Sequence, residues 1–302
     1  MKVTTLCLSL LIASTSLPAA AEVSNRDIPP DALWYINIDM ESLRTSKPGQ
    51  VILDWVDDEV VDDMEKEFDF DAGEDLDRLF FHGNAEGSFS ARILGTLSDA
   101  TRAHMLSEML KNTDATLKND GWGEYYVIDD AGDEIEFDNG DMSLDTDTIY
   151  VSLATGDGLF IASSAERLEA EIRGIRGGNA NVLVLDGRRP FLQIGVNADE
   201  LDESQQFDFD SDLLRQTSQV ALMIGSVGDS LDFHTRITAT DPEVTDSMAN
   251  IVRGLISLRM LSNEVPEAVG SIIDKLNVDS DSGGMSIRLQ VTPDEVRALS
   301  DL

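Results

Sequence analysis

The stretch that decides the fold is LWYINIDMESL, residues 33–43, because a second stretch, FLQIGVNADEL, residues 191–201, matches it without a gap. In each stretch a short apolar segment leads into an acidic turn and a leucine, and a proline precedes it, at Pro30 and Pro190. Apolar segments bounded by turn residues are typical of β-strands. A match between two distant parts of one chain indicates a repeated structural unit.

Two further matches occur in the same order along the chain. The tetrapeptide FDFD stands at residues 68–71 and again at 207–210, and a segment containing leucine and arginine follows each copy. A predicted strand at Phe89–Thr96 matches another at Leu231–Thr240, aligned on Arg92-Ile93 and Arg236-Ile237. The common order of the three matches indicates an internal duplication.

Three segments have the signature of a helix start. In each, a serine or threonine stands three residues before a glutamate, so that the two residues can cap the first turn reciprocally. The three segments are Ser163–Glu166, Thr240–Glu243 and Thr292–Glu295. The second is followed by an apolar stripe at helical spacing, for which we expect core packing; it consists of Val244, Met248, Ile251, Val252, Leu255 and Ile256.

Two more elements are predicted in the first half. Residues 50–68 have apolar residues on one helical face and aspartates on the other, which indicates an amphipathic helix. Tyr125–Ile128 and Glu134–Phe137 flank turn residues and predict a hairpin.

A glycine-rich stretch, Arg173–Arg189, is the best candidate for a boundary between two units. It contains an apolar segment, Val182–Leu185, and is therefore not expected to be a free linker. The sequence thus predicts an α+β fold of two related lobes, residues 22–178 and 179–302. Each lobe is expected to be a mostly antiparallel sheet with helices packed on one face.

The N-terminus predicts export. Lys2 precedes an apolar run, and small residues ending in Ala21 follow it, which is the pattern of a signal peptide over residues 1–21 with cleavage after Ala21. The expected location is periplasmic or secreted. Cys7, the one cysteine of the chain, would be removed, so the mature chain would have neither disulfides nor thiolate chemistry. No later segment is apolar enough to span a membrane.

The charge of the chain excludes one class of partner. Asp and Glu number 58 against 22 Lys and Arg, giving a formal net charge of −36. A chain this acidic, with no basic stripe, is not expected to bind nucleic acid. Abundant aspartate with few lysines is typical of adaptation to high salt, because salt screens the repulsion among the carboxylates. We expect stability to rise with salt concentration.

Several segments resemble a group of exported bacterial proteins with duplicated α+β lobes. They are Pro29–Tyr35 with Asp39 and Leu43, Glu74–Leu79, Gly87–Leu97 and Gly156–Ser164. The resemblance spans most of the chain after residue 21 and implies the duplicated α+β fold. That group has no established activity, so the resemblance implies no catalytic residue, cofactor or partner.

We nominate no metal ligand. Acidic residues gather at Asp69, Asp71, Glu74, Asp75 and Asp77, and again at Asp279 and Asp281, but neither cluster has the spacing of a calcium loop. A solvated acidic surface is the simpler interpretation. The three histidines, His82, His104 and His234, are not at ligand spacing, and His82 and His234 are expected to be partly buried in strands.

We also nominate no catalytic or cofactor-binding residue. The segment Gly87–Ala91 lacks the final glycine of a nucleophile elbow. The glycine-rich segments 174–178 and 225–228 lack the lysine or the spacing of nucleotide-binding loops. A pair of carboxylates for acid–base catalysis is defined by spatial separation and cannot be found in a sequence. Trp122–Tyr126 is the aromatic segment that could line an open cleft.

These observations favour a non-catalytic binding or envelope-associated module with an unknown protein or small-molecule partner. The alternative is a periplasmic hydrolase that uses carboxylates or a metal. An enzyme should have a deep pocket in which ionisable groups converge, whereas a binding module could have an exposed apolar patch. A surface contact through the amphipathic segment Ile251–Leu261 is a third possibility, disfavoured because Arg253 and Arg259 are its only cations.

Overall fold

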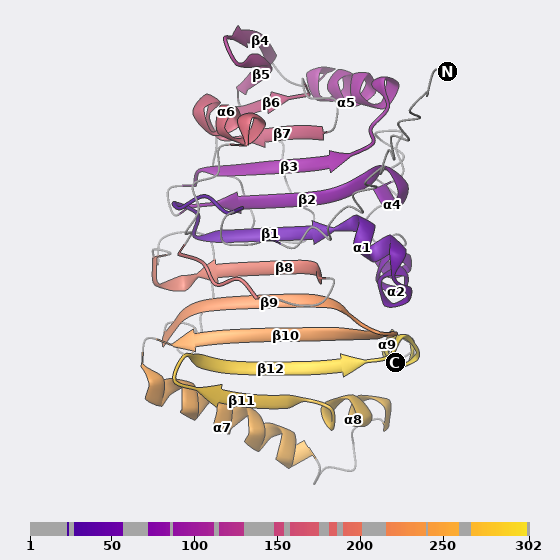
Figure 1. Cartoon of the computed structure of the whole chain (residues 1–302), viewed down its shortest axis with the longest axis vertical. Coiled ribbons are helices and arrows are strands. Elements are labelled where there is room, and N and C mark those ends of the chain that lie inside the picture. Colours follow the sequence, from indigo (N-terminus) through magenta and orange to yellow (C-terminus); the bar gives the residue numbers. More distant parts are fainter. Residues whose placement is uncertain are drawn as a thin grey trace, which may run out of the picture.

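A computed structural model describes residues 23, 27–56, 72–84, 87–111, 115–129, 148–153, 158–174, 181–185, 190–200, 216–239, 241–259 and 267–300. Within these residues the strands form one antiparallel sheet of twelve, with helices at its ends and on its faces (Figure 1). The α+β class with a mostly antiparallel sheet is therefore confirmed.

The twelve strands are β1 (Trp34–Asp39), β2 (Leu76–Gly83), β3 (Phe89–Gly95), β4 (Ala115–Asp120), β5 (Gly123–Asp129), β6 (Thr148–Ser152), β7 (Gly158–Ala162), β8 (Pro190–Asn197), β9 (Thr217–Val227), β10 (Ser230–Ala239), β11 (Asn277–Asp281) and β12 (Gly284–Val291). The helices are α1 (Met40–Thr45), α2 (Lys47–Val56), α4 (Ala72–Asp75), α5 (Asp99–Lys111), α6 (Ala165–Arg173), α7 (Pro242–Arg259), α8 (Glu267–Ile273) and α9 (Pro293–Ser300), with a short 3₁₀ turn, η3 (Ala198–Glu200).

The sheet is joined at its middle by β1 and β8. From β1 outward the strand order is β1-β2-β3-β7-β6, and β5 and β4 continue it to one edge. From β8 outward the order is β8-β9-β10-β12-β11, which ends at the other edge. The strands predicted within residues 33–43 and 191–201 are β1 and β8, and they lie side by side in a single sheet.

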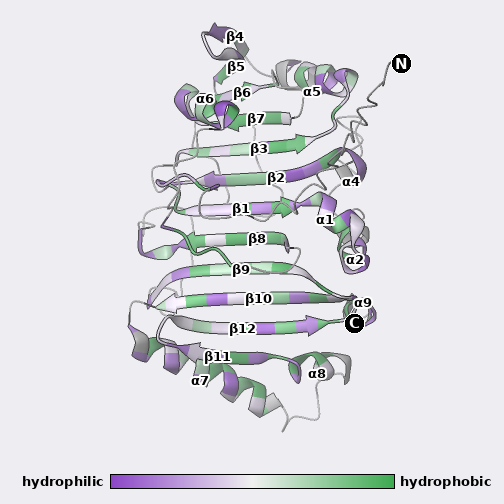
Figure 2. Cartoon of the chain, viewed as in Figure 1, coloured by the Kyte–Doolittle hydropathy of each residue, from purple (hydrophilic) through white to green (hydrophobic). Residues whose placement is uncertain are grey.

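The middle strands have one fully buried face and one half-buried face. Along β1 the side chains alternate, with Tyr35, Asn37 and Asp39 buried and the intervening residues partly exposed, as the two-residue period of a strand requires. The buried face is covered by residues that precede β1 and by Val182, which pack with Tyr35 and Phe80. In Figure 2 the strands β8 and β9 are mostly apolar, whereas hydrophilic and apolar residues alternate along β10 and β12.

The helices lie on both faces, which differs from the expected single face. In β7, Leu159 packs in the same cluster as Met105 of α5. Its neighbours Phe160 and Ala162 point to the opposite side, where they pack with Leu168 of α6. Because successive side chains of a strand alternate, α5 and α6 cover opposite faces.

The predicted helix start is confirmed for α9 and is shifted by one residue for α6 and α7, because α6 is capped by Ser164 rather than by Ser163. Ser164 Oγ accepts a hydrogen bond from Arg167 N (3.2 Å), and Glu295 Oε2 accepts one from Thr292 N (2.9 Å). At α7 the capping side chain is Asp241, whose Oδ1 accepts from Glu243 N at 2.9 Å. A proline follows at the first helical position, where its missing N–H has no partner to lose.

Two predictions fall partly outside the described residues. The predicted helix over residues 50–68 is described as α2 up to Val56, and the rest lies outside the described part of the chain. Tyr125–Ile128 is part of β5, as expected for a strand, but β5 pairs with β4 on one edge and β6 on the other. The expected partner, Glu134–Phe137, lies outside the described residues.

Candidate functional site

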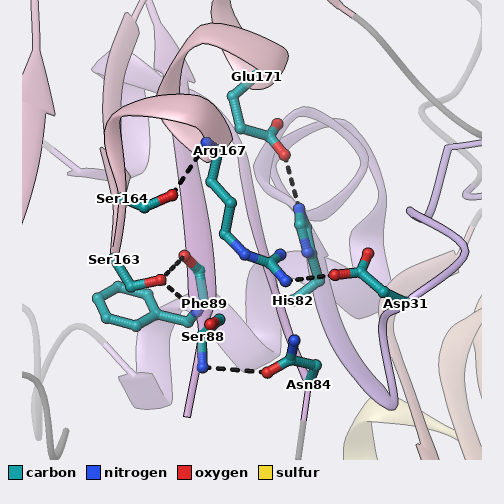
Figure 3. Close-up of polar contacts among 9 residues, drawn as sticks. All are labelled: Asp31, His82, Asn84, Ser88, Phe89, Ser163, Ser164, Arg167 and Glu171. Carbon is teal, nitrogen blue, oxygen red and sulfur yellow. Dashed lines mark hydrogen bonds and ion pairs between the residues drawn. The ribbon is translucent and has the colours of Figure 1, made fainter. Parts of the chain in front are cut away.

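Ionisable side chains of α6, β2 and β3 meet on one face of the sheet, and Figure 3 shows two of them, Glu171 of α6 and His82 of β2. The helix α6 begins at its serine cap and ends at Gly174, which has a left-handed conformation (φ 62°) that glycine adopts readily. Leu168 is fully buried against the sheet and sets the rotation of the helix. One turn later, Glu171 is thereby directed at the buried face of the two strands.

The two carboxylate oxygens of Glu171 each lie close to a nitrogen atom in this cluster. Its Oε1 lies 2.7 Å from His82 Nε2, and its Oε2 lies 2.9 Å from Arg92 Nε. The side chains of Glu171, His82 and Arg92 are only 9%, 1% and 6% exposed. A carboxylate and a guanidinium can be buried together because each compensates the other's charge in a region of low dielectric constant.

The cluster continues across the middle of the sheet as a row of neighbouring residues. The ring of Phe80 lies between two arginines, with the guanidinium carbon of Arg92 at 4.4 Å and that of Arg78 at 5.6 Å from its centroid. Arg78 Nε donates to Asn37 Oδ1 (2.6 Å), and Asn37 Nδ2 donates to Gln193 Oε1 (3.3 Å). The strands β3, β2, β1 and β8 are therefore joined by buried polar and cation–π contacts as well as by the backbone ladder.

Contacts at the start of α6 connect it to the surrounding strands and to the N-terminal segment (Figure 3). Arg167 forms an ion pair with Asp31. Ser163 Oγ accepts from Phe89 N at 3.0 Å, and Asn84 Oδ1 accepts from Ser88 N at 3.1 Å. These bonds hold the ends of β2, β3 and β7 together beside the buried cluster.

The cluster does not have the geometry of a nucleophilic site. Ser90 lies directly across the strand pair from His82, and Ser90 Oγ and His82 Nδ1 are both buried without a hydrogen-bond partner. An activated serine must be hydrogen-bonded to its histidine and reachable by a substrate. Ser90, which is 1% exposed, meets neither condition. Neither Glu171 nor Arg92 was singled out from the sequence, because the contact joins residues 79 positions apart.

The predicted acidic clusters are distributed over the surface. Asp69 and Asp71 lie outside the described residues, while Asp77 pairs with Arg44 at 2.9 Å. Asp281 pairs with Arg236 at 2.8 Å, and this hydrogen bond holds the pKa of Asp281 below its usual range. Within the described ranges no three His, Cys, Asp or Glu residues are grouped so that they could hold a metal ion.

The histidines have different surroundings. His82 and His234 are buried on their strands, as expected, and His104 is half-buried on α5. Burial lowers the pKa of His234, and the nearby cations Arg288 and Arg236 lower it further. His82 is the one that contacts a carboxylate, through the contact with Glu171 described above.

The aromatic segment 122–126 does not line an open cleft. The rings of Trp122 and Tyr125 stack with their centroids 4.8 Å apart, and Tyr125 packs in the cluster that holds Leu168. The Tyr125 hydroxyl donates to Asp120 Oδ2 at 2.7 Å, and this bond, with burial, raises the pKa of Tyr125 to about 12. Packing and hydrogen bonding therefore account for these rings.

An exposed apolar row on α7 is the feature that the sequence did not predict correctly. Met248, Val252 and the rest of one helical face pack on the sheet as expected. Ile251, Leu255 and Leu258, however, are 58%, 62% and 63% exposed. Ile251 and Leu255 directly precede Val252 and Ile256, which pack on the sheet. Successive side chains of a helix are rotated by about 100°, so Ile251 and Leu255 point away from the sheet. The expected core packing is thus wrong for Ile251 and Leu255.

Comparisons with known proteins assign no family. No family model matches the chain, and no curated protein matches it. Crystal form III of TP0453 aligns with 94% of this chain and 100% of its own, at 8% identity and a TM-score of 0.45, and crystal form I aligns with 93% and 98% at 6% identity and a TM-score of 0.40. A likeness at these TM-scores carries no argument about function. None of the described helices is long and apolar enough to cross a membrane.

Proposed function

We propose that this chain is an exported, non-catalytic interaction module, adapted to high salt, that works by binding another protein. The observation that carries this proposal is the row of three exposed apolar side chains on α7. Large apolar side chains exposed side by side are typical of surfaces that a partner covers. The single exposed apolar residues found on most protein surfaces carry no such meaning.

The enclosed position of the buried cluster supports the non-catalytic part of the proposal. His82, Arg92 and Glu171 are ionisable groups that converge from separate elements, as catalytic groups do. Their low exposure leaves no path for a substrate to the carboxylate or the imidazole. The polar row that they belong to has a structural role, because it ties four neighbouring strands to α6.

The two halves of the chain are proposed to be related units, residues 22–178 and 179–302. The matched strand orders β1-β2-β3-β7-β6 and β8-β9-β10-β12-β11 support this duplication. It rests also on the sequence match between residues 33–43 and 191–201. A duplicated unit built around one sheet gives a rigid scaffold that presents helices at both ends.

Export and salt adaptation belong to the same proposal. Residues 1–21 have the pattern of a signal peptide, and removing them would leave a chain without cysteine. Loss of Lys2 leaves 21 Lys and Arg against 58 Asp and Glu, and the resulting net charge of −37 would keep such a chain soluble in salty surroundings, where the repulsion between carboxylates is screened. Contact with a partner would then depend on surfaces that lack carboxylates, as the apolar row of α7 does.

Photo-crosslinking in the exporting cell tests the proposal. A photo-reactive phenylalanine analogue replaces Leu255, and a matched variant carries it at Leu117, an exposed apolar residue of the edge strand β4. We expect a discrete protein adduct from position 255 and none from position 117. If positions 251, 255 and 258 all fail to give an adduct in cells that export the chain, α7 is not an interaction surface and the proposal fails.

A further inference from the structure

The side of α7 that faces away from the sheet carries two parallel rows of residues. One row is large and apolar, and the other is small or polar. The large row is Ile251, Leu255 and Leu258, and the small row is Ser247, Asn250 and Gly254. All six residues are exposed, and the two rows run along the same face of an eighteen-residue helix.

Gly254 is not explained by the packing of the chain on itself. A Cβ atom added there would meet no atom within 4 Å, so nothing in the described part of the chain requires a glycine. A glycine in the middle of a helix costs stability relative to alanine. Small residues at such positions are instead characteristic of places where a second helix approaches closely.

The residues of the two rows have the same spacing when one row is counted in the reverse direction along the helix. Positions 251, 255 and 258 are spaced by four and then three residues, and positions 254, 250 and 247 have the same spacing in the opposite direction. We propose that α7 pairs with α7 of a second copy of this chain, antiparallel and about a two-fold axis. This inference rests on the proposed function, and it names the partner.

In this pairing the two outer levels of the interface each hold one large and one small side chain, and the middle level holds Leu255 beside Asn250. When one helix is reversed, Ile251 of one copy lies beside Gly254 of the other. In the same register, Leu258 of one copy lies beside Ser247 of the other. Antiparallel helices pack in this way, with a residue of one seam position next to a residue of the other. Since a two-fold axis makes every contact twice, one helix supplies both halves of the interface.

Two serine hydroxyls of the exposed face are compatible with burial. Ser247 Oγ donates to Glu243 O at 2.8 Å, and Ser257 Oγ donates to Arg253 O at 2.8 Å, so both hydroxyls are bonded within the helix. Arg253 turns away from the apolar row, because its Nε and Nη2 donate to Val278 O on β11 (3.1 and 2.9 Å). That arrangement disfavours an anionic membrane as the occupant, since one of the two cations of the segment is engaged within the chain.

The charge distribution favours a second copy at this place. No acidic residue occurs between Asp246 and Glu264, the longest such interval in residues 22–302. Two copies that each carry −36 repel one another, and they do so least where carboxylates are absent. Association should therefore strengthen at about 1 M salt, where the Debye length falls to about 3 Å. One helix pair is a small interface, so we expect a dissociation constant of about 1–100 μM.

Sedimentation velocity of the purified chain at low and molar NaCl tests the pairing. We expect a species of twice the 33.0 kDa chain mass that grows with salt and concentration. Leu255→Asp should give a monomer with an unchanged melting temperature, and Leu117→Asp on β4 is the matched control that should still dimerise. Gly254→Ala should raise the melting temperature of the monomer while weakening the dimer at least tenfold.

A compensating pair of changes tests the register itself. Gly254→Leu puts two large side chains at the level shared with Ile251 and should give a monomer. Adding Ile251→Ala to the same chain restores one small residue to that level and should restore the dimer to within about tenfold of the original affinity. A dimer that ignores both Leu255→Asp and Gly254→Leu would place the contact elsewhere and overturn the inference.

The remaining outcomes separate this inference from the proposed function. A chain that stays monomeric at molar salt, yet gives a heavier heterologous adduct from position 255 in cells, overturns self-pairing and leaves the interaction module standing. A monomer that sediments with neutral phosphatidylcholine vesicles, and loses this with Leu255→Asp, assigns the row to a lipid surface and overturns both. An adduct of twice the chain mass supports both.

Discussion

Ile36 of β1 lies directly opposite Ile194 of β8 in the middle of the sheet. The same two residues are matched when residues 33–43 are aligned with residues 191–201, because each is the fourth residue of its stretch. A pair that is both aligned in sequence and opposed in an antiparallel ladder marks a local two-fold axis between the strands. This coincidence is the observation that supports the proposed duplication most directly.

The register continues the correspondence outward from that pair. Phe81 of β2 lies opposite Ile36 and Ala91 of β3 lies opposite Phe81, while Leu222 and Thr235 hold the same places beyond Ile194. Arg92 follows Ala91, and Arg236 follows Thr235, so the two arginines hold corresponding positions in β3 and β10. The sequence match aligns the same two residues. Their contacts differ, because Arg92 is buried with Glu171 and Arg236 pairs with Asp281 at the surface.

Replacing Glu171 or Arg92 singly should destabilise the fold by about 3–5 kcal/mol, because each change removes the oppositely charged partner of a buried group. The double variant Glu171→Leu, Arg92→Met should cost clearly less than the two single costs together. Urea unfolding measures all three free energies. The control is Glu169→Ala on the same helix, which breaks the more exposed pair with Arg173 and should cost about 0.5 kcal/mol or less. Additive costs would mean that the buried pair is not coupled.

Gly195 of β8 should not tolerate even a methyl group. A Cβ there would lie 2.3 Å from Tyr35 Cε1 and 2.6 Å from Leu183 O, so the covering segment would have to move. Gly195→Ala should lower the free energy of unfolding by about 1–3 kcal/mol. Gly121→Ala is the control, since its added Cβ meets nothing within 4 Å. Equal stability of the two variants in urea titrations would contradict this packing.

His234 should remain neutral to a lower pH than an ordinary histidine. Burial and the cations Arg288 and Arg236 lower its pKa, while Asp232 opposes them. Between the folded and the unfolded pKa, the unfolded chain binds a proton at His234 that the folded chain does not. The stability is therefore full above the unfolded pKa of about 6.5 and is lost as the pH falls through the folded pKa. Proton NMR titration of the histidine C2 signals, assigned with His234→Gln, checks the shift. A midpoint at or above that of a model peptide would contradict it.

The melting temperature should rise with NaCl concentration. Salt screens the repulsion among the 58 carboxyl-bearing residues, and the unfolded chain, being more expanded, gains less from that screening. Calorimetry at low and molar NaCl checks the direction. KCl at equal ionic strength is the control, since screening does not depend on the cation. A melting temperature that is flat or falling with salt would count against the proposed adaptation.

The exported chain should begin at Glu22. Val23 is buried, and its backbone N–H donates to Gln193 Oε1 at 3.1 Å, so the new N-terminus would lie next to the middle of the sheet. Intact-mass spectrometry of the exported protein checks the position. Ala21→Phe should block cleavage, because the peptidase needs a small residue there, whereas Ala20→Ser should not. A mature chain that keeps Cys7 would contradict both the cleavage and the proposed cysteine-free state.

Predictions from sequence were best where the physics is local. The start of α9 could be predicted, because a threonine and a glutamate three residues apart form their hydrogen bonds within one turn, whereas the cap of α6 lies one residue after the predicted Ser163. The strands at residues 33–43 and 191–201 were equally predictable, since alternation and bounding turns are features of a single segment. The pairing of β5 with β4 and β6 was not, because strand partners are chosen over long distances.

The buried cluster and the exposed row of α7 show the same limit. Nothing near Glu171 indicates that it will reach His82, because that contact is made by the way α6 is placed on the sheet. The residues Ile251 and Val252 are equally apolar neighbours, yet one is exposed and the other packs on the sheet.

The sequence by itself determined the strands within residues 33–43 and 191–201, the start of α9 and the net charge. These follow from local hydrogen bonding, side-chain periodicity and charge, each of which is a property of neighbouring residues. Only the tertiary structure decided that both halves share one sheet, which carboxylate is buried, and which side of α7 is left uncovered. Those outcomes depend on how distant elements compete for the same apolar surface. The apolar stripe of α7 is wider than the area that contacts the sheet, so residues such as Leu255 are left exposed to solvent.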